Sequence, residues 1–150
     1  MEADRLGLRE RVRGIALVAD SNFLMQIASG LVAPSMILDA LEASYTLLVP
    51  RRVVEELGLL ASRGPRPSVR RLASRALWLL ERLGAVVVDV EASNADDAVE
   101  ALAAKLRGEG LRVVVATSDR ALRGRLRWRG IPSLYYRESE GRLELEWEPE

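Results

Sequence analysis

The chain alternates short apolar runs with longer segments in which apolar residues recur every three or four positions. The apolar runs lie at residues 15–19, 45–49, 85–88, 112–116 and 133–136. Helical spacing is found at Val53, Leu57 and Leu60, at Leu72, Ala76 and Leu80, and at Ala98, Leu102 and Leu106. Alternating strands and helices predict an α/β fold of three layers, α/β/α, with a central, mostly parallel sheet.

Two segments complete the predicted organisation. Residues 62–68, SRGPRPS, predict a loop between two helices rather than a domain linker, because neither side alone has enough apolar residues for a core. Residues 141–147 alternate apolar and mostly acidic positions after a predicted turn at 140–141, which predicts a C-terminal edge strand. We expect one domain over residues 1–150, with residues 1–13 as a flexible N-terminal extension.

Composition restricts the available chemistry. The 150 residues include no cysteine and no histidine, which excludes disulfides, thiolate metal sites and imidazole bases. Catalysis would then use carboxylates, hydroxyls, arginine or a metal. The first 14 residues are too charged for a signal peptide, and no apolar run approaches the roughly 20 residues that span a bilayer, so we expect a cytoplasmic protein. Few Asn and Gln beside many Arg and Glu favour a thermophile, although GC-rich codon usage gives the same composition.

The formal net charge of zero hides a separation of charge along the chain. Residues 138–150 hold six glutamates and one arginine, so residues 1–137 carry a balance of +5. Residues 63–82 contain six arginines and one glutamate, and residues 120–129 contain five arginines and no acid. Arginine suits bidentate phosphate contacts, so these patches predict a polyanionic partner such as RNA. The predicted RNA-binding residues are Arg70, Arg71, Arg120 and Arg123.

Two tryptophans accompany the arginine patches. Trp78 lies in a leucine-rich helical stripe and is predicted to be part of the core. Trp128 lies among arginines and is a candidate for stacking on a base.

Acidic residues follow the predicted strands where ligands bind in open α/β sheets, beyond the carboxyl ends. Asp20 follows the first strand, Asp119 follows the fourth, and Asp96 and Asp97 open a helix after a short loop. Each alone is explained by helix capping or by the helix dipole. Together at one sheet edge they would repel one another, so the sequence indicates a need for a counter-charge there.

A further acid comes from the helix predicted after residue 50. Glu56 flanks the apolar face that contains Val53 and Leu57, whereas Glu55 points nearly opposite. Glu56 is therefore predicted to be half-buried. The alternative, a surface glutamate paired with Arg52 one turn earlier, stays open on this pattern alone.

Four segments, in order and spacing, resemble the four motifs of the PIN-domain ribonucleases. They are VADSNFLM, VPRRVVEELGLLA, NADDAVEALA and VVVATSDRALRGRLRWRGIPSLYYR. The long last motif, the Asp96–Asp97 pair and the closing RESEGRLELEW are most similar to the archaeal relatives of the ribosomal-RNA processing branch. Toxin-type members share the acids but resemble the third and fourth motifs less. The resemblance covers residues 14–146, apart from an insertion around 65–67.

The resemblance implies a set of site residues. The family's catalytic, metal-binding acids correspond to Asp20, Glu56, Asp97 and Asp119, with supporting polar groups at Asn22, Asp96, Thr117 and Ser118. Which of Asp96 and Asp97 is the main ligand stays open. Ligands that are all oxygen favour Mg²⁺ or Mn²⁺ as the cofactor, and the number of ions, one or two, also stays open.

The resemblance implies a metal-dependent ribonuclease, expected to be an endonuclease, with a role in ribosomal RNA processing. Two alternatives stay open: an inactive RNA-binding ribosome-assembly factor, and a toxin-type PIN ribonuclease of a toxin–antitoxin pair. A phospho-acceptor signalling domain is disfavoured, because the only lysine, Lys105, lies in a predicted helix rather than after a late strand. A nucleotide-binding Rossmann domain is excluded by the absence of its glycine fingerprint. A homodimer and a protein partner are both left open.

Overall fold

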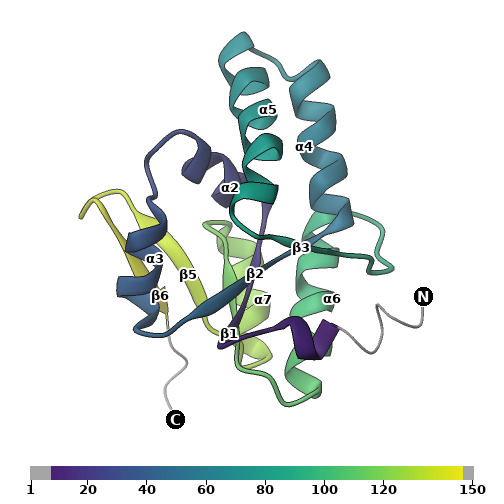
Figure 1. The fold of residues 1–150 in the computed structure, drawn as a ribbon, viewed down its shortest axis with the longest axis vertical. Helices are drawn as coiled ribbons and strands as arrows, with labels where there is room; N and C mark the ends of the chain where they lie inside the picture. The colour runs from purple at the N-terminus through teal and green to yellow at the C-terminus, as the bar shows by residue number, and fades with distance from the viewer. Residues whose placement is uncertain (1–7, 147–150) are drawn as a thin grey trace.

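A computed structural model describes residues 8–146 and contains a sheet of six strands (Figure 1). The strand order is β3-β2-β1-β4-β5-β6, and every neighbouring pair is parallel except β5 and β6, which are antiparallel. The strands are β1 (Ile15–Ala19), β2 (Tyr45–Pro50), β3 (Val86–Val88), β4 (Val113–Ala116), β5 (Ser133–Arg137) and β6 (Arg142–Glu146).

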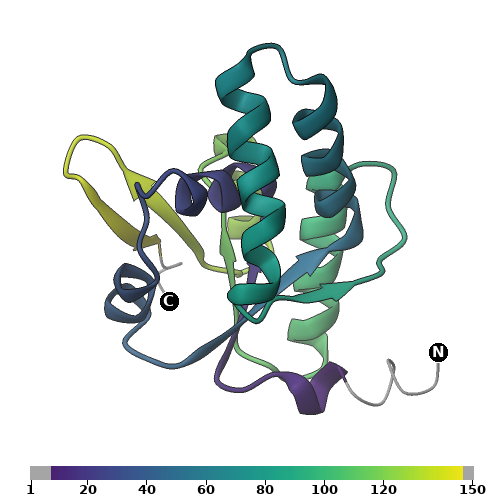
Figure 2. The ribbon, with the colours of Figure 1, turned by 45° about the horizontal axis from the view of Figure 1, so that its top comes forward.

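Helices connect the strands and cover the sheet. They are α2 (Ser21–Ala28), α3 (Pro34–Leu41), α4 (Arg51–Arg63), α5 (Pro67–Arg82), α6 (Ala95–Gly108) and α7 (Arg120–Trp128). Helix α6 packs on β1, β2 and β4, α7 packs on β5, and α5 packs against α2. Figures 1 and 2 show α4 and α5 side by side as a hairpin that projects beyond the sheet. The predicted α/β/α architecture with a mostly parallel sheet is confirmed.

The core is centred on β1 and β4, the two middle strands. All residues of β1 and β4 are buried, because helices cover the sheet and leave no strand face to solvent. This explains why both strands are continuous apolar runs rather than alternating patterns. As a consequence, the first polar residues after these two strands lie together at the carboxyl edge of the sheet.

The strand predictions agree with the structure to within about one residue at each end. Residues 64–66 separate α4 from α5, so the predicted interhelical loop is confirmed. The edge strand is confirmed over Arg142–Glu146, after a turn in which Gly141 adopts a φ of +63°. Residue 147, predicted as part of this strand, lies outside the described residues.

The prediction that Trp78 belongs to the core is wrong, since its side chain is 55% exposed. Helix α5 buries Ala73, Ala76 and Leu80, and Trp78 lies about 200° around the helix from Ala76. The guanidinium of Arg82 lies 4.0 Å from the centroid of the Trp78 ring.

The chain before β1 contacts the folded body. Residues 8–11 are helical, and Leu8 packs into the core. The backbone N–H of Arg13 donates to Thr46 Oγ1 at 2.7 Å. Within residues 8–146, no helix has the length and apolar character needed to cross a membrane.

Candidate functional site

Acidic residues that follow four adjacent strands lie at one edge of the sheet. Asp20 directly follows β1, and Asp119 follows β4 after two intervening residues. Glu56 lies in the second turn of α4, which leaves β2, and Asp96 lies in the first turn of α6, which follows β3. Because β3, β2, β1 and β4 are neighbours and parallel, their carboxyl ends form one continuous edge.

Asp20 is buried within this edge, with 8% of its surface exposed. Its Oδ1 accepts a hydrogen bond of 2.9 Å from the backbone N–H of Phe23, so Asp20 is the N-cap of α2. The hydroxyl of Thr117 donates to its Oδ2. Burial raises the pKa of Asp20 to about 6, against these two hydrogen bonds, and the charges of Asp96 and Asp119 add to the increase.

Thr117 links the two central acids. It is fully buried, and its Oγ1, besides donating to Asp20, accepts from the backbone N–H of Asp119 at 3.1 Å. Asp119 Oδ1 accepts from the backbone N–H of Leu122 at 2.9 Å and so caps α7. The caps engage one oxygen of each aspartate, and Thr117 engages the second oxygen of Asp20. Ser118 Oγ is buried without a hydrogen-bond partner among the described residues.

The neighbouring acids Asp96 and Asp97 have different surroundings. Asp96 is half-buried, and its pKa is raised by burial and by the nearby charges of Asp119 and Glu56. Asp97 is exposed, and its Oδ2 accepts from Asn94 Nδ2 at 3.3 Å and Ser93 Oγ at 3.4 Å. Asp96 therefore belongs electrostatically to the acidic edge, whereas Asp97 is engaged with the residues that cap α6.

Glu56 faces the edge but is exposed, so the predicted half-burial is wrong. The buried face of α4 is limited to Val53 and Leu57, and Glu56 lies beside it in solvent. Ser21 Oγ donates to Glu56 Oε1 at 2.7 Å, which ties this glutamate to the start of α2 beside Asp20. Glu55, not Glu56, pairs with Arg52, at 3.7 Å.

The acidic edge is poorly neutralised by the protein itself. We define the acidic cluster as Asp20, Glu56, Asp96 and Asp119; within residues 8–146 none of these four forms a salt bridge. Arg125 is the one cation that lowers the pKa of Asp96 among the described residues, and it is already bonded to Glu100 at 2.9 Å. Burial alone would raise the pKa of Glu100, but hydrogen bonds from Arg129 and Arg125 outweigh it and lower that pKa.

The donor set of the acidic cluster fits a hard divalent cation. Its carboxylates and the Thr117 hydroxyl are oxygen donors, and their mutual repulsion is relieved by a positive ion. The side chains are not gathered into a finished metal site, since no three acids of residues 8–146 meet in one compact group. Binding an ion would therefore draw the carboxylates closer together.

The four predicted RNA-binding arginines lie in different environments. Arg70 is half-buried and donates from Nη1 to Gly64 O at 2.8 Å, a contact that supports the α4–α5 turn. Arg71 and Arg120 are exposed. Arg123 is 15% exposed, stacks 3.8 Å from the centroid of Tyr135, and lies 3.8 Å from Glu146.

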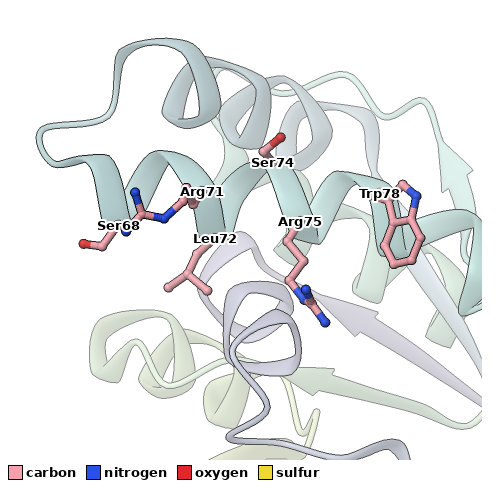
Figure 3. Close-up of a pocket in the computed structure, with 6 residues that line it drawn as sticks. All are labelled: Ser68, Arg71, Leu72, Ser74, Arg75 and Trp78. Atoms are coloured by element: carbon pink, nitrogen blue, oxygen red, sulfur yellow. The ribbon is translucent and has the colours of Figure 1, made fainter.

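The two arginine patches also differ in how far acids neutralise them. In α7 and the residue after it, Arg125 and Arg129 bond Glu100 at 2.9 and 2.7 Å, and Arg127 bonds Glu146. By contrast, Arg71 and Arg75 of α5 have no ion pair within residues 8–146. Figure 3 shows their side chains spread along α5 with Trp78. Helix α5 therefore carries exposed positive charge that acids within residues 8–146 do not neutralise.

Sequence reasoning missed three residues at this edge. Ser21 holds Glu56, and its only signal was a hydroxyl next to Asp20. Gln26 and Tyr135 line a polar cavity beside Asp119, and neither belongs to a motif of acids or arginines. Trp128, the predicted stacking residue, is 93% exposed on α7.

Comparison with known proteins gives a family match and a structural match. A family model described as "PIN like domain" matches residues 17–139. No curated protein matches the sequence. The chain is similar to the structure of the PIN domain endonuclease Utp24, with a TM-score of 0.66 and 19% sequence identity over 88% of this chain and 91% of that chain. At this identity the similarity concerns the fold.

Proposed function

This chain belongs to the PIN-like domain family, and we propose that it is a divalent-metal-dependent ribonuclease that hydrolyses RNA phosphodiester bonds at the acidic cluster. The observation that carries the proposal is the convergence of Asp20, Glu56, Asp96 and Asp119 from four separate elements without a neutralising salt bridge. Mutual repulsion of carboxylates destabilises a fold unless a positively charged ligand neutralises them. The similarity of fold to a PIN domain endonuclease supports internal cleavage of the RNA chain.

We propose Asp20, Asp96, Asp119 and Glu56 as the residues that hold Mg²⁺ or Mn²⁺. Asp96 is favoured over Asp97 because its charge is coupled to Asp119 and Glu56, whereas Asp97 is engaged with Asn94 and Ser93. Bound there, a divalent cation supplies Lewis-acid activation of a water nucleophile and stabilises charge on the leaving oxygen.

The supporting residues orient the acids. Thr117 and the N–H of Phe23 fix Asp20, and Thr117 also fixes the backbone of Asp119. Ser21 holds Glu56 toward Asp20. These contacts reduce the reorganisation needed when the acids gather around an ion, in the way that outer hydrogen bonds orient metal ligands in general. Asn22 and Ser118 line a cavity beside the acids and would act on substrate rather than on the ion.

The RNA path is proposed along α5. Arg71, Arg75, Trp78 and Arg82 follow one another at helical spacings of four, three and four residues, so they form one stripe, which we call the α5 stripe. It is about 17 Å long, enough for several phosphates of a single strand. Helix α5 packs on α2, the helix that Asp20 caps, so RNA held along α5 would lie on a helix that adjoins the one leading from the acidic cluster.

The proposed role is in the processing of ribosomal or other structured RNA in the cytoplasm, because the long last motif, the closing RESEGRLELEW and the Asp96–Asp97 pair resemble the ribosomal-RNA processing branch. The alternatives are an inactive assembly factor and a toxin-type ribonuclease. Incubation of a panel of RNAs with Mn²⁺, Mg²⁺ or EDTA tests the proposal. We expect metal-dependent products from the wild type and none from Asp20→Asn.

A further inference from the structure

A second site adjoins the acidic cluster and is not part of it. A polar cavity of about 580 Å³ lies between α2, the loop after β4, α7 and the end of β5. Its wall begins at Asn22, two residues after Asp20, and includes Ser118, the residue before Asp119. Since β5 is the neighbour of β4, the cavity continues the acidic edge by one strand.

The wall of this cavity contains an unusual group of buried polar atoms without hydrogen bonds. They are Gln26 Oε1, Ser118 Oγ, Arg123 Nε and Nη1, and Arg137 Nε. Arg123 Nη1 lies 3.8 Å from Glu146 Oε1, longer than a good hydrogen bond, and Arg137 Nε lies 3.5 Å from Glu140, although Arg137 Nη1 bonds Glu144 at 3.1 Å. Unpaired buried polar atoms cost free energy, and several around one cavity indicate that a polar ligand completes them.

The chemistry of the wall matches a nucleotide. Arg120, Arg123 and Arg137 offer guanidinium donors suited to phosphate, and Tyr135 offers an aromatic face that Arg123 already covers at 3.8 Å. The amide of Gln26 carries both a donor and an acceptor, as a base edge does. The volume falls within the roughly 300–1,000 Å³ of typical ligand pockets.

We propose that this cavity binds one unpaired nucleotide of the RNA, next to the phosphodiester that is cut, and selects its base through Gln26. The inference rests on the proposed ribonuclease function, because it places the scissile bond at the adjoining acids. Sequence-specific RNA recognition uses unpaired bases that stack on aromatic or arginine planes and expose their edges to hydrogen bonds. The substrate would accordingly be a single strand or a loop.

Binding can be tested without cleavage. The four nucleoside 5′-monophosphates and inorganic phosphate are titrated separately into the metal-free full chain and followed by backbone amide NMR. We expect shifts at residues 22, 26, 118 and 135–137, and dissociation constants that differ about tenfold between the best and worst base. If inorganic phosphate binds as tightly as the best nucleotide, or if the shifts lie elsewhere, the inference is overturned.

The variant Gln26→Leu separates recognition from folding. It replaces the amide by an apolar group and removes an unpaired buried acceptor, so the melting temperature should stay equal or rise. Its preference among the four bases should fall to less than about threefold. The control is Met25→Leu in the same helix, which does not line the cavity and should keep the preference.

The same variants separate the two proposals. On a randomised single-stranded RNA with Mn²⁺, the wild type should cut beside a preferred base, and Gln26→Leu should cut without preference. Nucleotide binding in the cavity together with uncut RNA would overturn the ribonuclease function and support the cavity assignment. Metal-dependent cutting with the same base preference in Gln26→Leu as in the wild type would overturn the cavity assignment and support the ribonuclease.

Discussion

At the scale of single residues, Asp20 determines how the acidic edge responds to pH. Its pKa in the folded chain, about 6, lies above the ordinary value of 3.8, because burial disfavours the charged form. The folded state therefore binds the proton more tightly than the unfolded state. This contribution to stability is complete below about pH 4 and is lost as the pH rises through about 6.

Replacing Asp20 by Asn should stabilise the metal-free protein at neutral pH. The substitution removes a buried charge while Asn Oδ1 can still accept from Phe23, so the free energy of unfolding at pH 7 should rise by about 1–3 kcal/mol. The gain should shrink toward zero below pH 4. Urea unfolding at pH 4 and pH 7 in EDTA measures both. An Asn variant less stable than wild type at pH 7 would contradict the burial argument.

The same carboxyl should control metal affinity, because a ligand must lose its proton to bind an ion. We expect Mn²⁺ affinity of the wild type to rise between about pH 5 and pH 7 as Asp20 ionises. In Thr117→Val the rise should move to higher pH, since the hydrogen bond that lowers this pKa is lost. Calorimetric titration at several pH values gives the midpoint. An unmoved midpoint would mean that another group controls binding.

Asp96 and Asp97 should separate function from stability. Asp96→Asn should lower kcat by more than about 100-fold, beyond the usual loss from a supporting partner, without loss of stability. Asp97→Asn should keep most activity but lose about 0.5–1 kcal/mol, because a negative charge near the N-terminus of α6 is removed. Measurements of turnover and of the melting temperature for both variants test this prediction. A reversed pattern would return the ligand role to Asp97.

At the scale of elements, the strands were predictable and the short helices were not. Runs such as 15–19 and 112–116 are apolar throughout because both faces of β1 and β4 are buried, and that signal is local. Helices α2 and α3 have only eight residues each and show too few turns for a helical period, so the sequence predicted neither.

The position of the acids followed from the direction of the strands, but their orientation did not. Asn94 caps α6, so Asp97 is the third helical residue and turns back to the cap, while Asp96 is left facing the edge. If Asn94 is taken as the N-cap, the sequence alone predicts that the Asp97 side chain points toward the cap and that of Asp96 does not. The pairs of Arg125 with Glu100 and Arg127 with Glu146 join separate elements, so no local pattern could indicate them.

The α5 stripe should account for much of the electrostatic part of RNA affinity. Arg71→Ala with Arg75→Ala should reduce the slope of log affinity against log salt by about 1.4, two contacts of about 0.7 each on a single strand. The control is Arg9→Ala with Arg112→Ala, which removes equal charge from exposed positions before β1 and β4. Fluorescence anisotropy at four salt concentrations measures the slope. If the slope changes equally in both double variants, the α5 stripe contributes no more to RNA affinity than any other surface charge.

At the scale of the whole molecule, segregation of charge explains how a chain with zero net charge could hold a polyanion. Acids without salt bridges gather at the carboxyl edge of the sheet, Arg71 and Arg75 on α5 have no ion pair within residues 8–146, and Arg125 and Arg127 of α7 pair with Glu100 and Glu146. A divalent cation would convert the acidic edge from repelling phosphate to binding it. Metal and RNA should therefore bind cooperatively.

The most direct test of the central claim is the cleavage of unstructured and structured RNAs by the wild type and by Asp20→Asn, with Mn²⁺ and with EDTA, alongside RNA affinity in Ca²⁺. The account predicts products from the wild type only with Mn²⁺, no products from Asp20→Asn, and an RNA affinity in Ca²⁺ that is weaker for Asp20→Asn than for the wild type. Tight RNA binding by the wild type with no cleavage in any divalent ion would contradict it and would identify an RNA-binding assembly factor instead.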